Sequence, residues 1–179
     1  MLVTRKETQR AEFTEFASAR SAALHRAAYL MVGDVSLAQD LVQEALTRTY
    51  VAWPRLRDTG RAEAYTRKAI TTTAISWFRR RSWQERPTDR VDERGAVGHE
   101  DGVAQHQWLW EALLELPARQ RAAVVLRYYE DLTEAQTAET MGCAVGTVKS
   151  QVSAALSKLR ERLGDDPLLL PLDDLVVTR

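Results

Sequence analysis

Apolar side chains recur along this 179-residue chain at the three-to-four-residue spacing of an α-helix, and no stretch alternates apolar and polar residues as a β-strand does. Glycine and proline number 8 and 5 and are absent from long segments. The fold is therefore predicted to be all-α. The expected helices are 11–31, 36–53, 61–83, 106–116, 117–129, 133–141 and 145–163.

Residues 86–105 interrupt this pattern, because they are charged, hold one proline and three glycines, and have no apolar periodicity. Such a segment buries too little surface to offset its ordering entropy, so a flexible acidic linker is expected. It would join two small helical domains, an N-terminal helical bundle at 1–85 and a C-terminal helix-turn-helix domain at 106–163. An acidic and apolar tail follows at 164–179.

Charge is balanced over the whole chain, at 25 basic and 25 acidic residues, but it is unevenly distributed. Residues 1–85 carry fourteen Lys and Arg against nine Asp and Glu. The single cysteine, Cys143, excludes a disulfide framework, and the three scattered histidines have no second cysteine with which to build a zinc site. No metal, cofactor or membrane span is expected, and the composition indicates a cytoplasmic protein.

The stretch "TEAQTAETMGCAVGTVKSQVSAALSKLRERL" begins at Thr133 with a capping-box pattern completed by Gln136. Gly142 stands where a helix C-terminus needs a left-handed residue. The helix expected from Val145 has small and short polar residues opposite its apolar stripe, which suits close approach to DNA. The pattern is typical of a helix-turn-helix whose second helix enters the major groove. On spacing alone, an ordinary helical hairpin remains an alternative.

Two N-terminal segments contain residues that suit binding to a partner. Asp40, Gln43, Glu44 and Thr47 share one helical face, which suits a basic partner, although a solvated face with Glu44 paired to Arg48 is the alternative. The segment "AYTRKAITTTAISWFRRRS" interleaves cations with aromatic residues, as single-stranded DNA requires. Its alternative interpretation places Trp77 and Phe78 in the core and the arginines on a solvated helix end.

Residues 116–160, which include "GTVKS", closely resemble the C-terminal promoter-binding domain of bacterial sigma factors of the extracytoplasmic-function (ECF) group, and in particular actinobacterial SigE-type members. The segment "GDVSLAQDLVQEALTRTYVAW" resembles the helix of that family that docks on core RNA polymerase. The resemblance implies a promoter-specificity subunit that is not an enzyme. Its implied partners are promoter DNA, the clamp helices of the largest polymerase subunit and the flap of the second largest. An anti-sigma factor is a further candidate partner, because such partners are common in the family.

The resemblance also implies three sets of contact residues. The polymerase set is Asp40, Leu41, Gln43, Glu44 and Thr47. The minus-ten set is Leu56, Arg57, Tyr65, Arg67, Lys68, Thr72, Arg79 and Arg80. In the minus-thirty-five set, Thr147, Ser150, Gln151 and Ala154 would read bases, and Arg121, Arg127, Lys149 and Lys158 would contact phosphates.

The sequence departs from the family pattern at several of these positions. Ala144 stands where members often have a capping serine, Thr72 where many have asparagine, and Gln151 and Ala154 where many have arginine. Three rivals therefore stay open: a stand-alone helix-turn-helix regulator, an adaptor without promoter activity, and a nuclease with Asp34, Asp40 and Glu44 as imagined metal ligands.

Overall fold

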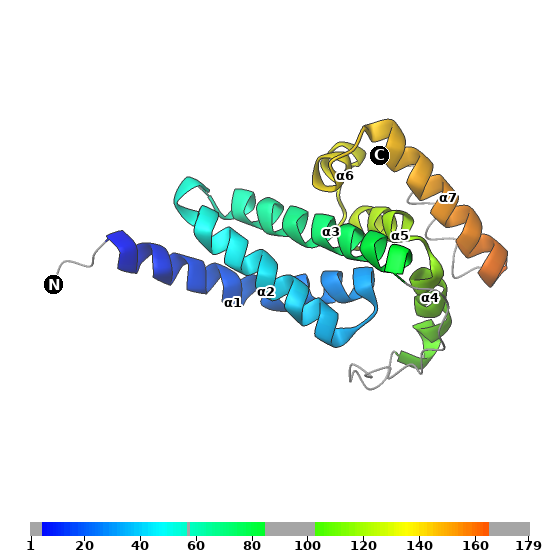
Figure 1. Ribbon diagram of the computed structural model, residues 1–179, viewed down its shortest axis with the longest axis horizontal. Helices are drawn as coiled ribbons and strands as arrows, with labels where there is room; N and C mark the ends of the chain where they lie inside the picture. Colours follow the sequence, from blue (N-terminus) through cyan, green and yellow to red (C-terminus); the bar gives the residue numbers. More distant parts are fainter. Residues whose placement is uncertain (1–4, 57, 85–102, 165–179) are drawn as a thin grey trace.

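The computed structural model describes residues 5–56, 58–84 and 103–164, and every regular element in these ranges is helical (Figure 1). The all-α prediction is confirmed. The N-terminal helices are α1 (Arg5–Val32), α2 (Val35–Ala52), the short η1 (Trp53–Arg55) and α3 (Thr59–Gln84). The C-terminal helices are α4 (Val103–Glu115), α5 (Ala118–Val124), the π-helical η2 (Val125–Tyr129), α6 (Glu134–Met141) and α7 (Val145–Leu163).

The three long N-terminal helices lie side by side, as Figure 1 shows, and α2 contacts both α1 and α3. The turn between α1 and α2 is made by Gly33, whose φ of 76° lies in the left-handed region. Asp34 then caps α2, because its Oδ1 accepts a hydrogen bond from the Leu37 amide at 2.8 Å. The helix therefore begins one residue before its expected start at 36.

At the far end of this bundle, three aromatic side chains join α1 to the end of α2. Phe13 and Phe16 pack around Trp53 with ring centroids 5.2 and 5.3 Å from it. Deeper in the bundle, the buried hydroxyls of Thr49 and Thr66 lie 2.8 Å apart between α2 and α3. These contacts fix α2 against the first turns of α3.

The helix-turn-helix expected at 133–163 is present as α6 and α7. Both hydrogen bonds of the capping box between Thr133 and Gln136 are formed, at 2.9 and 3.2 Å. Gly142 ends α6 with φ of 64°, as its position predicted. Ala144 precedes α7 in an extended conformation and supplies no side-chain cap.

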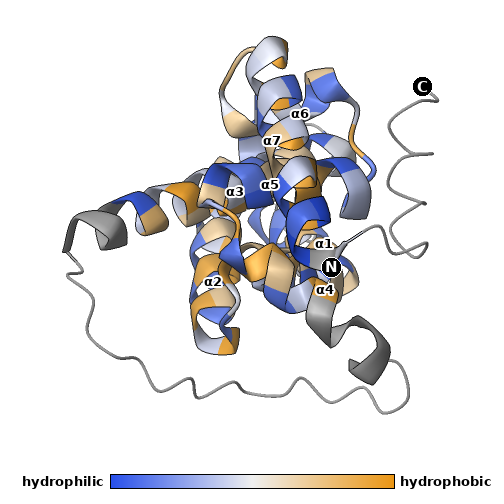
Figure 2. Cartoon of the chain, turned by 90° about the vertical axis from the view of Figure 1, so that its right-hand side faces the viewer, coloured by the Kyte–Doolittle hydropathy of each residue, from blue (hydrophilic) through white to orange (hydrophobic). Residues whose placement is uncertain are grey.

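The two helical units pack on each other through one apolar core. Leu24, Met31 and Ile70 of the N-terminal unit join Leu126 and Val148 of the C-terminal unit in this cluster. Of the C-terminal helices, α5 and α6 lie against α3, and Figure 1 shows α7 on the outer side of α5. Figure 2 gives a second view of the same arrangement. The helical spacing correctly predicted apolar stripes, but it did not predict that the two units bury them against each other.

The expected linker at 86–105 and tail at 164–179 lie almost wholly outside the described residues. The one described part of the linker is helical, since α4 begins at Val103, three residues before the predicted domain start.

Candidate nucleic-acid and polymerase interface

The outward face of α2 carries most of the residues predicted to meet polymerase. Asp40, Gln43 and Thr47 are exposed, and Glu44 is half-buried. Glu44 pairs with Arg48 at 2.5 Å, as the alternative interpretation of this face predicted, while Asp40 and Gln43 stay accessible beside the pair. The face therefore presents both carboxylate and amide groups.

Leu41 was included in the polymerase set, but its side chain is fully buried in the core. It belongs to the apolar stripe of α2 that packs on α1 and α3, so a partner cannot reach it in this arrangement. Leu41 positions the contact face and does not form part of it.

A groove lies along the same helix, and the sequence analysis did not predict it. It has a volume of about 480 Å³, and Gln43, Thr47 and Tyr50 contribute to its lining from α2. Tyr50 is 44% exposed and Val51 is 76% exposed, and apolar colouring is visible on α2 in Figure 2. The sequence did allow Tyr50 to be assigned to this face, because Tyr50 lies three residues after Thr47 and so shares its side of the helix.

The first part of the minus-ten set lies around the start of α3. Leu56 lines a cavity of about 580 Å³ whose walls include Phe16 and Trp53. Tyr65, at 39% exposure, and Lys68 are both exposed on α3. Tyr65 and Lys68 offer an exposed ring and a cation, which are groups that suit single-stranded DNA. They do not line the cavity beside Leu56, whose walls instead include the acids Glu12, Glu15 and Asp58.

Further along α3 the residues predicted to contact the minus-ten element differ in their exposure. Thr72 is half-buried and its hydroxyl donates to the Lys68 carbonyl at 2.8 Å, whereas Arg79 is exposed. Trp77 and Phe78 pack against the shared core, which confirms their alternative interpretation as core residues. Arg57 and the side chain of Arg80 lie outside the described part of the chain.

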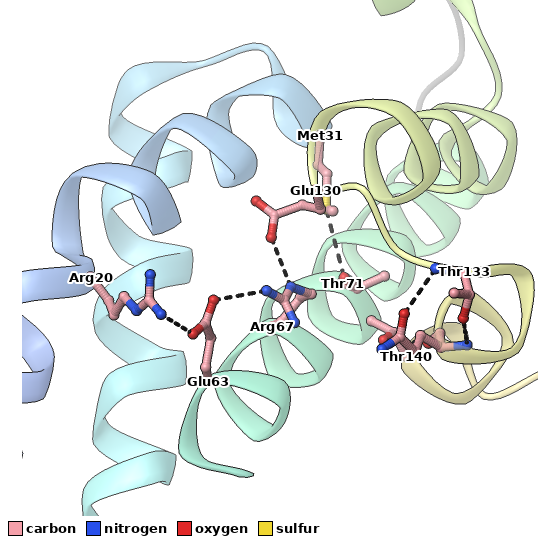
Figure 3. A network of polar contacts seen from close by, with 9 residues as sticks. Arg20, Met31, Glu63, Arg67, Thr71, Glu130, Thr133 and Thr140 are labelled. Carbon is pink, nitrogen blue, oxygen red and sulfur yellow. Dashed lines mark hydrogen bonds and ion pairs between the residues drawn. The ribbon is translucent and has the colours of Figure 1, made fainter. Parts of the chain in front are cut away.

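Arg67 is engaged by carboxylates from both units, as Figure 3 shows. Its Nη2 lies 2.9 Å from Glu63 and its Nε lies 2.8 Å from Glu130, which follows η2. The Arg67 side chain is only 16% exposed. In this arrangement its charge is matched inside the protein and is not presented to DNA.

The outer face of α7 carries the minus-thirty-five set. Lys149, Ser150 and Lys158 are exposed, and Thr147, Gln151 and Ala154 are half-buried. The opposite face, with Val148, Ala155, Leu156 and Leu159, is buried. Lys149 lies 3.4 Å from Glu134 of α6, and such an exposed pair contributes little to stability. The helix thus offers short polar groups flanked by two lysines.

Two arginines expected at phosphates are turned inward. Arg127 donates from Nη1 to the Leu132 carbonyl. Arg121 is 4% exposed, lies 4.8 Å from the centre of the Phe78 ring and donates to the Leu114 carbonyl at 3.0 Å. Burial lowers the pKa of Arg121 to about 10, which leaves it charged at neutral pH. Arg121 therefore acts here as a contact between α3, α4 and α5.

The described residues contain neither a metal-binding cluster nor a membrane-spanning helix. None of their His, Cys, Asp and Glu side chains form a group of three or more that could hold a metal ion. Among the helices of that same part, none has the length and apolar content needed to span a bilayer.

Comparison with known proteins matches both units of the chain in order. Residues 17–84 match the family described as Sigma-70 region 2, and residues 106–159 match Sigma-70, region 4. The RNA polymerase sigma-E factor of Streptomyces coelicolor is 39% identical over 152 residues, which cover 85% of this chain and 86% of that protein. This chain belongs to the ECF sigma factors.

Other relatives of this sigma factor agree with that placement. The ECF RNA polymerase sigma factor SigL of Mycobacterium tuberculosis is 30% identical over 164 residues, covering 89% of this chain and 88% of SigL. A solved structure of the sigma factor RpoE in complex with the anti-sigma factor NepR, from Bartonella quintana, superposes with a TM-score of 0.67 at 25% identity. It covers 87% of this chain and 98% of the RpoE chain.

Proposed function

We propose that this sigma factor binds core RNA polymerase through the outward face of α2 and directs it to promoters. Asp40, Gln43, Glu44 and Thr47 would meet the clamp helices of the largest subunit, with Tyr50 at the edge of the same surface. The C-terminal unit would meet the flap of the second-largest subunit. The protein would act in the cytoplasm, where the transcribing enzyme works, and would supply recognition without catalysing a reaction itself.

The two DNA-facing surfaces would divide the promoter between them. The start of α3, with Leu56, Tyr65 and Lys68, would receive the minus-ten element and help to melt it. The exposed face of α7 would read the minus-thirty-five element through Thr147, Ser150, Gln151 and Ala154, with Lys149 and Lys158 on phosphates. Arg67 and Thr72 would join the minus-ten contacts once they are accessible.

One observation supports this proposal over its rivals. A single chain carries the region 2 and region 4 matches in order, and exposed residues of the proposed contact sets lie in both units, among them Asp40 on α2 and Lys149 on α7. A stand-alone helix-turn-helix regulator needs α7 but leaves the exposed acids of α2 without a role. An adaptor that has lost promoter activity needs no polar reading face on α7.

Run-off transcription with purified core RNA polymerase on a genomic promoter library tests the proposal. We expect selective initiation that falls at least about tenfold for the double variant Asp40→Ala with Glu44→Ala, because it removes two charges from the polymerase face. Loss of the exposed Glu44–Arg48 pair costs only about 0.5 kcal/mol, so the variant should remain folded.

The matched control is Glu139→Ala with Glu161→Ala, which removes two exposed acids from α6 and α7 and should initiate normally. Tight duplex binding without any polymerase-dependent initiation would favour the stand-alone regulator. Absence of both activities would favour the adaptor. An anti-sigma factor, as in the RpoE complex, would be sought by affinity capture and then required to suppress initiation.

A further inference from the structure

A cavity with a volume of about 840 Å³ lies where the second half of α3 meets the C-terminal helices. Its volume is within the range of about 300 to 1,000 Å³ that ligand pockets commonly have. Apolar side chains form much of its wall, among them Ile75 and Phe78 of α3, Leu114 of α4 and Met141 of α6. The cavity therefore offers a surface on which the apolar side chains of a ligand can pack.

Three arginines add positive charge to this wall. Arg79 comes from α3, and Arg119 and Arg121 come from α5, where Arg119 is exposed and Arg121 is buried. None of the described residues that line the cavity is an aspartate or a glutamate. The cavity therefore suits a ligand that combines apolar side chains with negative charge.

The buried arginine of this wall is incompletely satisfied. Among the described residues, the Nε atom of Arg121 has no hydrogen-bond partner, although the residue is only 4% exposed. Arg121 donates to the Leu114 carbonyl and lies over the Phe78 ring, and neither group carries a formal charge. A buried cation without a counter-ion is costly, so an acidic ligand in the cavity would stabilise it.

The end of the chain has the composition that this cavity suits. Residues 165–179 lie outside the described residues, and their sequence places an apolar run between acids. Asp165 and Asp166 precede "PLLLPL", and two further aspartates follow it at 173–174. One basic residue, Arg179, stands against these four acids. The tail therefore complements the cavity in both charge and hydropathy.

The tail also starts beside the cavity. In the last turn of α7, the Nη2 atom of Arg162 lies 2.5 Å from the Oε1 atom of Glu115 in α4. Leu116 and Pro117, which come directly after Glu115, line the cavity. An extended chain of five residues spans at most about 18 Å, which is enough for the apolar run that starts at Leu168 to reach this wall.

We infer that residues 165–176 of the tail bind in this cavity, with Leu168–Leu170 on the apolar wall and the aspartates facing the three arginines. The chain thereby supplies its own acidic and apolar ligand, which packs on α3 and α5 together. The inference goes beyond the proposed function and does not depend on it, because it concerns contacts within one chain and needs neither polymerase nor promoter.

Nuclear magnetic resonance spectroscopy of the isotope-labelled full chain tests the inference. We expect nuclear Overhauser contacts between the methyl groups of Leu168–Leu170 and the ring of Phe78. The backbone order parameters of these leucines should be about 0.8, whereas those of a mobile chain fall below about 0.6. A sample that mixes labelled and unlabelled chains distinguishes contacts within one chain from contacts with a second copy.

A charge reversal in the wall tests the electrostatic part of the inference. Arg119→Glu reverses an exposed charge of the cavity, and Arg55→Glu, at an exposed position on η1, is the matched control. Glutamate is favourable in the first turn of a helix, so Arg119→Glu should fold. We expect Arg119→Glu to lower the order parameters of Leu168–Leu170 below about 0.6, and Arg55→Glu to leave them unchanged.

A change in the tail itself tests the apolar part without altering any helix of the described structure. Leu169→Asp with Leu170→Asp removes two apolar side chains and should abolish the contacts with Phe78. Thr178→Asp adds a charge near the end of the tail, outside the apolar run, and should leave those contacts in place.

Order parameters below about 0.6 for Leu168–Leu170 in the wild type would overturn the inference, as would contacts of these leucines with another surface or with a second copy. If inorganic phosphate shifted the Arg119 and Phe78 resonances while the tail of the wild type stayed mobile, the cavity would be a site for small anions and the inference would be wrong. Normal run-off transcription by a chain with a mobile tail would refute only this inference. An ordered tail in a chain that never initiates would refute only the proposed function.

Discussion

At the scale of single residues, the partners of three cations could not be predicted from the sequence. These cations are Arg67, Arg121 and Arg127. Each was expected to touch DNA, and each instead has its partner inside the protein. A sequence shows where cations lie, but tertiary packing decides which groups they meet. Arg67 pairs with carboxylates, whereas Arg121 and Arg127 donate to backbone carbonyls, which leave the charge in place. A partial signal existed for Arg121, because the "AAVVL" that follows it makes the helix apolar on all sides, which is typical of a buried helix.

Substitution of Arg121 tests its internal role. Arg121→Ala should lower the free energy of unfolding by about 2 kcal/mol, since it removes both the contact with Phe78 and the hydrogen bond to Leu114. Arg121→Met keeps the apolar stem and should lose about 1 kcal/mol. Urea unfolding measures both values.

The pH dependence of this residue follows from its pKa of about 10 in the folded chain, which burial lowers from the ordinary value of an arginine. Burial of the cation costs stability at every pH below about 10, and the cost is released only as pH rises above that value. Between about pH 6 and pH 9 the difference between wild type and Arg121→Met should therefore be constant. If Arg121→Met weakened duplex binding and left stability unchanged, the phosphate role would stand instead.

At the scale of elements, local signals predicted most of what the structure contains. Thr133 with Gln136, Gly142 and the apolar stripe of α7 each fix structure through neighbours within a few residues, and all three were read correctly. The π-helical turn of η2 was not predicted. The expected helix at 117–129 contains no residue whose local preference requires a turn wider than that of an α-helix. Contacts between helices, such as the buried hydroxyls of Thr49 and Thr66, have no sequence signal either.

The missing cap of α7 gives a stability prediction. Ala144→Ser should raise the free energy of unfolding by about 1 kcal/mol, because a hydroxyl at this extended position can accept an unpaired amide of the first turn. Ala135→Ser, on the exposed surface of α6, serves as the control and should change it by less than about 0.5 kcal/mol. Thermal unfolding compares the two, and equal effects would mean that α7 is not limited by its cap.

The hydroxyl contact between α2 and α3 gives a second stability prediction. Thr49→Val and Thr66→Val should each lower the free energy of unfolding by about 1 to 2 kcal/mol, because each leaves a fully buried hydroxyl with fewer partners. The double variant should lose less than the sum, since the two groups satisfy each other. Strict additivity in a double-mutant cycle would show that the hydroxyls do not interact.

At the scale of the whole molecule, the order of the two units was predictable and their mutual packing was not. Both apolar stripes were visible, but a stripe records only that a face is buried. The shared cluster that contains Leu24 and Ile70 also contains Leu126 and Val148, which are far from them in the chain. Which apolar faces pack together depends on the complementary shapes of the helix surfaces, and the spacing of apolar residues along a helix does not specify those shapes.

A shared core predicts cooperative unfolding. Calorimetry of the full chain should show one transition, with calorimetric and van't Hoff enthalpies in agreement. Leu126→Ala, at a fully buried position, should lower the midpoint of that transition without dividing it, at a cost of about 3 kcal/mol. Two resolved peaks in the wild type would show that the units unfold independently.

The π-turn at Val125–Tyr129, closed by the Glu130 amide on the Val125 carbonyl at 3.0 Å, holds one residue more than an α-turn. Loss of that residue would rotate everything after it by about 100° about the helix axis. Tyr129 and Glu130 would then turn away from Arg26 and Arg67. A homologue that lacks one residue at this point should therefore form neither the Arg26–Tyr129 hydrogen bond nor the Arg67–Glu130 ion pair.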